Sequence, residues 1–197
     1  MKSPLFEKFN GTIYLGSQSP RRQQLLGEMG AVFEVVTLPD LEEIYPKSLT
    51  SREVPVYLAS HKSRSLWEQV EDKNGVLITA DTVVAIGERI LEKPGDRAHA
   101  IQMLTELSGI THAVVTGVTL KTAQKTISFS DTTQVTFRRL SLPEIEFYVD
   151  NYKPFDKAGA YGIQEWIGLV GVSRINGSYF NVVGLPVEKL YRELMHL

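Results

Sequence analysis

Apolar residues follow two periods along this chain, one typical of strands and one typical of helices. Apolar runs or residue-by-residue alternation predict strands at residues 32–37, 76–80, 112–122, 125–138 and 170–174. Apolar residues three or four positions apart predict helices at about residues 20–29, 55–70 and 96–107, with two more opening at Ser141 and Pro186. This order predicts an α/β protein with an elongated mixed sheet flanked by helices. We expect a single domain over residues 1–197, with two lobes around a cleft.

Two glycine-containing turns predict hairpins. Residues 83–86 and 89–91 flank Gly87-Glu88, which is typical of a tight connection between antiparallel strands. Near the end of the chain, Asn176-Gly177 separates residues 170–174 from the apolar segment 178–183. The same rule predicts a second hairpin there.

The run Val76–Ala80 is apolar apart from Thr79, as in a buried central strand, and Asp81 follows it directly. The pattern therefore predicts that Asp81 lies at the carboxyl end of this strand. Ligands of open α/β sheets gather at the carboxyl ends of strands, so this carboxylate is a candidate functional group. The structural alternative is that Asp81 caps a turn together with Thr82.

The stretch Gly16–Arg22 places small residues, two hydroxyls and two guanidiniums between a short strand and a helix. Ser19 is a favourable N-cap and Pro20 suits the first helical position, so unpaired N–H groups and the positive end of the helix dipole meet there. Arg21 and Arg22 add positive charge, which a bound phosphate would neutralise. The alternative is a helix cap with two solvated arginines. The stretch has neither the Gly-Lys-Ser/Thr ending of a P-loop nor the glycine spacing of a dinucleotide fold.

The composition narrows the possible chemistry. With 21 basic and 23 acidic side chains, the formal net charge is −2, which gives no case for binding nucleic acid or a membrane surface. The absence of cysteine excludes disulfides, zinc–thiolate sites and cysteine nucleophiles, which leaves oxygen ligands for a hard cation as the main metal option. Residues 1–11 have no apolar segment of the signal-peptide kind, so we expect a cytoplasmic protein.

Three kinds of side chain recur where the predicted elements end. They are the cations of Arg21, Arg22, Lys62 and Lys93, the carboxylates of Glu42, Glu43 and Asp81, and the hydroxyl or amide groups of Ser17, Thr82 and Gln164. Each residue alone is consistent with a solvated surface. Phosphate-ester chemistry uses all three kinds, because cations neutralise phosphate charge, carboxylates hold a divalent cation, and a carboxylate can take a proton from water.

Three short segments occur in a fixed order: Ser17–Arg22 (Ser-Gln-Ser-Pro-Arg-Arg), Ala80–Val84 (Ala-Asp-Thr-Val-Val) and Leu91–Pro94 (Leu-Glu-Lys-Pro). They resemble the Ser-x-Ser-Pro-Arg-Arg, Ala-Asp-Thr-Val-Val and Leu-x-Lys-Pro segments of the Maf family of nucleoside triphosphate pyrophosphatases. The resemblance runs from about Tyr14 to Leu190, and the order and separation of the three segments argue against coincidence.

The resemblance implies hydrolysis of a nucleoside triphosphate between the α and β phosphates, giving a monophosphate and pyrophosphate, with Mg²⁺ or Mn²⁺ assisting. It also implies a fold like that of the inosine triphosphatases and a homodimer. By position, Asp81 corresponds to the family's acidic base and Glu43, or Glu42 in the neighbouring register, to its second acidic residue. Asp81 and Glu43 would hold the metal, and Lys93 joins them as a catalytic residue. Arg21, Arg22, Lys62 and Lys93 would hold phosphates.

Residues 157–164 (Lys-Ala-Gly-Ala-Tyr-Gly-Ile-Gln) resemble the branch of the family that acts on dTTP and UTP. Arg21, Thr82 and Gln164 match the positions tied to base choice in that branch. A glutamine amide can pair with the O4 and N3–H edge of thymine or uracil. The residues expected to bind substrate are Ser17, Arg21, Arg22, Lys62, Thr82 and Gln164.

Two departures from the family pattern accompany this resemblance. Glu165-Trp166 stands where the family usually has a glycine after the glutamine, and Ser63 stands in place of the usual alanine. The first would narrow or reshape the base pocket. The alternatives are a pyrophosphatase for 7-methylguanosine triphosphate and a non-catalytic nucleotide-binding regulator of cell division. A regulator needs only a phosphate cradle, so the presence of Asp81, Glu43 and Lys93 favours an enzyme.

Overall fold

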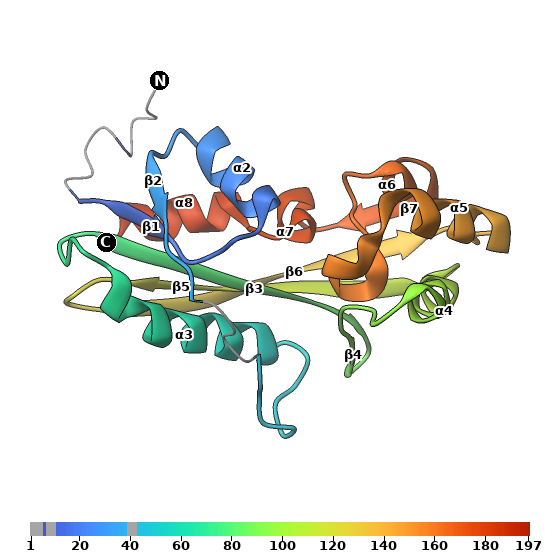
Figure 1. Cartoon of the computed structure of the whole chain (residues 1–197), viewed down its shortest axis with the longest axis horizontal. Coiled ribbons are helices and arrows are strands. Elements are labelled where there is room, and N and C mark those ends of the chain that lie inside the picture. Colours follow the sequence, from blue (N-terminus) through green and yellow to red (C-terminus); the bar gives the residue numbers. More distant parts are fainter. Residues whose placement is uncertain (1–5, 7–10, 39–42) are drawn as a thin grey trace.

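A seven-stranded mixed sheet forms the centre of the computed structural model, which describes residue 6 and residues 11–38 and 43–197 (Figure 1). The strands are β1 (Ile13–Leu15), β2 (Phe33–Val35), β3 (Val76–Ile86), β4 (Arg89–Leu91), β5 (Thr111–Lys121), β6 (Thr126–Phe137) and β7 (Val172–Asn176). Their order is β2-β1-β3-β5-β6-β7, with β4 paired to one end of β3. The pairs of β1 with β2 and β3 are parallel and the other pairs are antiparallel. The predicted α/β class, mixed sheet and first hairpin are confirmed.

Helices flank the sheet on both faces (Figure 1). They are α2 (Pro20–Glu28), α3 (Val54–Leu66), α4 (Arg97–Leu107), α5 (Leu142–Tyr152), α6 (Trp166–Gly171), α7 (Tyr179–Val183) and α8 (Val187–Met195), with 3₁₀ turns η1 (Trp67–Gln69), η2 (Pro154–Asp156) and η3 (Ala158–Ala160). Predicted caps are present, because Asp96 accepts a hydrogen bond from the His99 amide, and Ser141 and Glu144 form a capping box. No helix among the described residues is both long and apolar enough to cross a membrane.

Two large hydrophobic cores lie along the sheet. One packs α2 and α8 against Ile78 and Ala80 of β3, and the other packs α4, α5 and α6 around Val84 of β3 and Phe137 of β6. The strand β3 therefore contributes to both. The predicted division into two lobes stays a prediction.

Helix α3 covers the other face of β3 and β5, where Leu58 packs with Val83 and Val115. Gly117 of β5 makes this close approach possible, since a Cβ there would lie 2.3 Å from backbone atoms of Pro55 and Val56. Gly117 is the register partner of Asp81, so the helix crosses the sheet beside that carboxylate.

The prediction that Asp81 lies at a strand end is wrong. Strand β3 continues through Asp81 to Ile86, because β5 pairs with it without interruption from Leu77 to Ala85. This long ladder is a contact between distant parts of the chain, which a local hydrophobic pattern does not contain. The turn cap proposed as an alternative for Asp81 and Thr82 is therefore also excluded.

The second predicted hairpin is also wrong. Residues Tyr179–Val183 form helix α7, with the Ser178 hydroxyl accepting a hydrogen bond from the Asn181 amide at 3.3 Å. Asn181 is fully buried, and its side-chain amide donates to Val114 O and Thr133 Oγ1, both at 3.0 Å. These tertiary bonds hold the segment against the sheet as a helix. Helix α6, just before β7, was not predicted.

The sheet has a gap beside Asp81. Strand β1 ends at Leu15, opposite Ile78, and β4 pairs with β3 only from Val84 onward. Within the described chain, no strand covers residues 79–83 of β3 on that edge. The carboxyl end of β1 therefore opens onto the middle of β3, and ligand access comes from the end of the neighbouring strand.

Candidate active site

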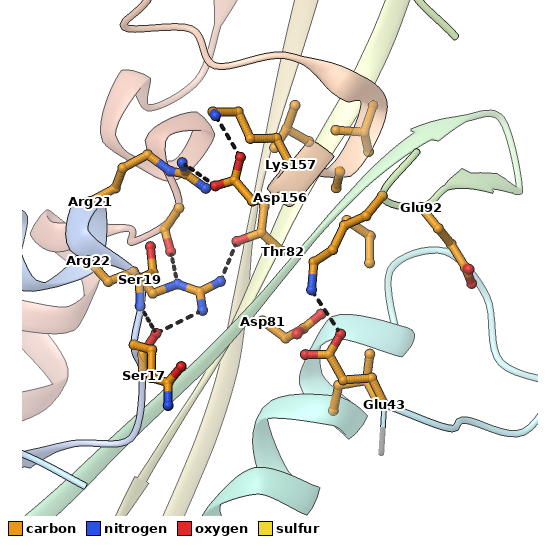
Figure 2. Close-up of a pocket in the computed structure, with 18 of the residues that line it drawn as sticks. Ser17, Ser19, Arg21, Arg22, Glu43, Asp81, Thr82, Glu92, Asp156 and Lys157 are labelled. Carbon is orange, nitrogen blue, oxygen red and sulfur yellow. Dashed lines mark hydrogen bonds and ion pairs between the residues drawn. The ribbon is translucent and has the colours of Figure 1, made fainter. Parts of the chain in front are cut away.

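A cavity of about 780 Å³ opens at the gap between β1 and β4 (Figure 2). Its volume lies in the range of small-molecule sites. Every residue that the sequence singled out as catalytic or substrate-binding lines it: Ser17, Arg21, Arg22, Glu43, Lys62, Asp81, Thr82, Lys93 and Gln164. The structure thus brings together groups from the loop after β1, from α2, α3 and β3, and from the segments after β4 and before α6. Glu42 lies outside the described residues.

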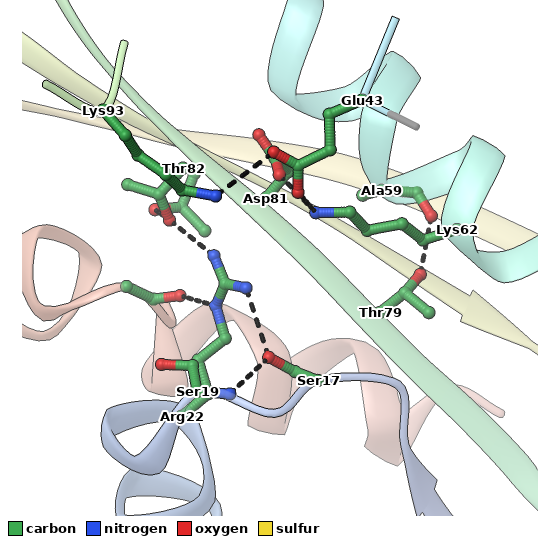
Figure 3. Close-up of polar contacts among 12 residues, drawn as sticks. Ser17, Ser19, Arg22, Glu43, Ala59, Lys62, Thr79, Asp81, Thr82 and Lys93 are labelled. Carbon is green, nitrogen blue, oxygen red and sulfur yellow. Dashed lines mark hydrogen bonds and ion pairs between the residues drawn. The ribbon is translucent and has the colours of Figure 1, made fainter. Parts of the chain in front are cut away.

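Asp81 and Glu43 share one cation (Figure 3). The Lys62 ammonium lies 2.6 Å from Asp81 Oδ1 and 2.6 Å from Glu43 Oε1, and Lys93 Nζ lies 3.3 Å from Glu43 Oε2. Lys62 and Asp81 are largely shielded, with side chains 14% and 10% exposed. Two carboxylates and two ammonium groups therefore alternate along one wall of the cavity.

The two carboxylates differ in their affinity for protons. Burial raises the pKa of Asp81 above its ordinary value, although the positive charges of Lys62 and Arg22 oppose the shift. Burial acts in the same direction on Glu43, but the ammonium groups of Lys62 and Lys93 outweigh it and hold the pKa of Glu43 below its usual value. Asp81 is consequently the stronger base of the two.

Arg22 is fixed across the cavity from this cluster. Its Nε donates to Gly184 O at 2.8 Å, Nη1 to Ser17 Oγ at 3.4 Å, and Nη2 to Thr82 Oγ1 at 3.0 Å (Figure 3). Burial lowers the pKa of its guanidinium. Arg22 is not a solvated cap residue, and its orientation is set before any ligand binds. Ser19 is the N-cap of α2 as predicted, although its side chain makes no capping bond.

Thr82 belongs to a chain of hydrogen bonds with one direction. Thr116 Oγ1 donates its only proton to Asn181 O at 3.0 Å, so in the 2.9 Å contact between Thr82 and Thr116 the donor is Thr82. Thr82 in turn accepts from Arg22. The Thr82 hydroxyl proton is therefore already donated to Thr116. Toward a ligand, the Thr82 oxygen acts as a hydrogen-bond acceptor. Thr116 lies on β5, far from every motif, and was missed at the level of sequence.

Arg21 faces a second group that sequence reasoning missed. Its Nη1 lies 3.1 Å from Asp156 Oδ2, and Asp156 Oδ1 lies 2.7 Å from Lys157 Nζ (Figure 2). Lys157 also lies 3.3 Å from Glu165 Oε1. The one sequence feature that could have pointed to Asp156 is its position directly before the Lys-Ala-Gly segment.

Gln164 is exposed and lines the cavity, whereas neither Glu165 nor Trp166 is among the residues that line it. Neither side chain therefore narrows the cavity directly, and the expectation that the pair reshapes the base pocket stays a prediction. The Glu165 side chain is turned toward Lys157 and Tyr148 instead.

The donor chemistry of the site suits a hard divalent cation. In the part of the chain that the structure describes, no group of three or more His, Asp or Glu side chains is placed to hold a metal ion. The oxygens of Asp81 and Glu43 nevertheless approach a single positive charge, that of Lys62, at equal distances. Two carboxylates plus phosphate oxygens are the usual ligands of Mg²⁺ at nucleotide sites.

The fold and the cavity define an α/β protein with a polar cavity in a gap of its sheet, where basic groups surround a buried carboxylate. The chain belongs to the family of Maf-like proteins, whose model matches residues 12–197. This confirms the resemblance found in the sequence motifs.

Two relatives and one solved structure extend this assignment. A dTTP/UTP pyrophosphatase of Phocaeicola vulgatus is 50% identical over 185 residues, covering 94% of this chain and 95% of the relative. A protein of the same name from Flavobacterium psychrophilum is 50% identical over 193 residues, covering 98% of each chain. The structure of a HAM1 protein from Coxiella burnetii has a TM-score of 0.52 at 15% identity and covers 94% of this chain and 99% of its own. That likeness concerns the fold, and it agrees with the predicted fold class.

Proposed function

We propose that this protein hydrolyses dTTP and UTP to the nucleoside monophosphate and pyrophosphate. The observation that carries the proposal is the Asp81–Lys62–Glu43 cluster, with both carboxylates 2.6 Å from one ammonium, facing the fixed guanidinium of Arg22 in a single cavity. The names of the two relatives at 50% identity support the same substrates.

In this proposal the cations bind and orient the triphosphate. Arg22 is held in place by Gly184, Ser17 and Thr82, so little side-chain entropy is lost when a phosphate oxygen binds to it. Arg21 and Lys93 line the cavity, and the partners of their charged ends among the described residues are partly exposed carboxylates, which a phosphate can replace.

Asp81 is the proposed base that takes a proton from the attacking water. Its raised pKa makes it a better base than an ordinary carboxylate, while Lys62 stabilises the ionised form that must accept the proton. Asp81 and Glu43 are also the residues that would hold Mg²⁺ or Mn²⁺. When bound, such an ion supplies charge neutralisation at the phosphate oxygens.

Base choice is assigned to Gln164, Thr82 and Arg21. The Gln164 amide can donate to O4 and accept from N3–H of uracil or thymine. Because the Thr82 hydroxyl already donates its proton to Thr116, the Thr82 oxygen is an additional acceptor. A purine such as 7-methylguanine presents a similar pair at O6 and N1–H, so it differs from uracil and thymine in its second ring and its 2-amino group.

The test is a panel of nucleoside triphosphates incubated with the protein in Mg²⁺ or Mn²⁺, with chromatography of the products. We expect monophosphate and pyrophosphate from dTTP and UTP, no turnover of purine nucleotides, and loss of activity in EDTA. Release of orthophosphate, or turnover of 7-methylguanosine triphosphate alone, contradicts the proposal. Binding without turnover of any nucleotide supports a regulator instead.

Two expectations remain part of the proposal. A cytoplasmic location agrees with a substrate drawn from the nucleotide pool, and a homodimer is expected from the family. Fractionation of cells and sedimentation equilibrium of the purified protein test them separately.

A further inference from the structure

The turn that carries Gln164 is held from behind the cavity wall. The Glu165 amide donates to Gly162 O at 3.0 Å and closes the turn, while the Gly162 amide donates to the Tyr148 hydroxyl, also at 3.0 Å. The turn is tightly packed, since a Cβ on Gly162 would lie 2.8 Å from Glu165 Cδ and 2.9 Å from Gln164 Nε2. Its two ends and the Gln164 side chain therefore occupy one small volume.

One buried hydroxyl holds both ends of this turn. Tyr148 of α5 is fully buried, accepts from the Gly162 amide and donates to the Glu165 carboxylate. Burial and the nearby carboxylate raise the pKa of Tyr148, so it keeps the proton that it donates. Because a phenol has one proton, its direction of donation is fixed toward Glu165.

A lysine balances the charge of Glu165. Lys157 Nζ lies 3.3 Å from Glu165 Oε1, and these side chains are 9% and 19% exposed. Through Asp156, which lies 2.7 Å from Lys157 and 3.1 Å from Arg21, the same network reaches the basic side of the cavity. Glu165 is thus fixed at both carboxylate oxygens without contacting the cavity.

A fixed turn matters because the glutamine amide is nearly symmetric in shape. Rotated by half a turn, it would accept from the amino group of cytosine where it otherwise donates to O4 of uracil. The two orientations interconvert by rotation of the side chain alone, so a fixed backbone favours the keto edge by holding the amide at the distance and angle that suit O4 and N3–H of uracil.

We propose that Glu165 is a positioning residue for base recognition: held by Tyr148 and Lys157, it fixes the 162–165 turn so that Gln164 selects uracil or thymine over cytosine. The inference rests on the proposed function and extends it to two residues outside the cavity, Glu165 and Tyr148.

The test compares binding of the α,β-methylene analogues of UTP and CTP, in which the bridging group resists hydrolysis, by calorimetry. The variants are Glu165→Ala, Tyr148→Phe and Glu165→Gln, with the exposed Glu146→Gln on α5 as the matched control. We expect Glu165→Ala and Tyr148→Phe each to lower the preference for the UTP analogue by about tenfold, the value of one hydrogen bond. Glu165→Gln, which can still accept from Tyr148, retains most of the preference, and Glu146→Gln retains all of it.

Turnover provides the second measurement. With UTP, Glu165→Ala should raise KM and leave kcat within about twofold of the wild-type value, because the reacting groups are untouched. An unchanged preference in folded Glu165→Ala and Tyr148→Phe overturns the inference, as does a wild-type protein that binds the two analogues equally. A wild-type protein that prefers the UTP analogue but releases no pyrophosphate from UTP overturns the proposed function alone, and the binding ratios still decide the role of Glu165.

Discussion

Lys62 Nζ lies 2.6 Å from Asp81 Oδ1, and both side chains are largely shielded from water. The pair joins a helix to the middle strand of the sheet, 19 positions apart in the sequence. Since Lys62 is the main compensating charge of Asp81, its removal leaves that carboxylate buried and poorly solvated.

Lys62→Met should therefore destabilise the protein, on the order of 3 kcal/mol in the free energy of unfolding measured by urea denaturation. Lys47→Met, at an exposed position, is the control and should change it by less than about 0.5 kcal/mol. In the double variant with Asp81→Asn, part of the loss should return, because the unpaired carboxylate is gone. Strict additivity of the two single changes would contradict this account of the pair.

Asp81→Asn should lower kcat for UTP by about a thousandfold, because it keeps the volume of the side chain and removes its charge and basicity. In the absence of divalent metal, binding of the α,β-methylene analogue of UTP should be unchanged or tighter, since a negative charge beside the phosphates is removed. Steady-state kinetics and calorimetry measure the two effects. Asp150→Asn, which breaks only an exposed pair with Arg97, should leave both values unchanged. A comparable loss of kcat in Asp150→Asn would mean that the effect is not local.

Ser63→Ala should raise the free energy of unfolding by about 1 kcal/mol. The Ser63 side chain is 1% exposed, and its hydroxyl has no hydrogen-bond partner among the described residues. Removal of an unsatisfied buried hydroxyl spares its desolvation cost. Thermal and urea unfolding test this, with Ser65→Ala, on the same helix, as a comparison because its hydroxyl donates to His61 O at 3.2 Å. A less stable Ser63→Ala would show that the hydroxyl has a favourable partner.

His112 should make the protein sensitive to mild acid. Burial lowers the pKa of His112 from 6.5 to about 4, so between these values the unfolded chain binds a proton that the folded chain does not. Stability is full above pH 6.5 and falls as the pH drops toward 4, by about 3 kcal/mol in total.

The measurement is the free energy of unfolding from pH 7.5 to pH 4 for the wild type and His112→Gln. The glutamine can still pair with the Tyr161 hydroxyl, which lies 2.7 Å from His112 Nε2, but does not titrate. The difference in the free energy of unfolding between the wild type and His112→Gln should be constant above pH 7 and should change steadily below pH 6.5. Parallel curves over the whole range would assign the acid sensitivity to other groups.

Sequence reasoning grouped the candidate site residues better than it placed the strands. The motif residues line one cavity, because Arg22, Lys62 and Asp81 lie at fixed places on elements whose hydrophobic pattern is clear. Two element predictions failed where a distant part of the chain decides the local conformation. The ladder with β5 carries β3 through Asp81, and the buried Asn181 holds residues 179–183 as a helix after an Asn-Gly pair that is typical of hairpins.

The hydrogen-bond partners of the site residues could not be predicted from local sequence patterns either, because they lie far away along the chain. Asp156 lies 135 positions from Arg21, and Thr116 lies 34 positions from Thr82, so no motif connects them. Glu165 was recognised as unusual, but the direction of its side chain depends on Tyr148, 17 positions away on another helix.

The strand β3 supplies side chains to both hydrophobic cores, Ile78 to one and Val84 to the other, with Asp81 and Thr82 between them. Neither core can lose this strand without exposing apolar surface in the other, so the two halves are not independent folding units. We therefore expect their unfolding to be cooperative, in one transition. The proposed catalytic carboxylate lies between the two cores on this strand, so loss of either core should disrupt the site.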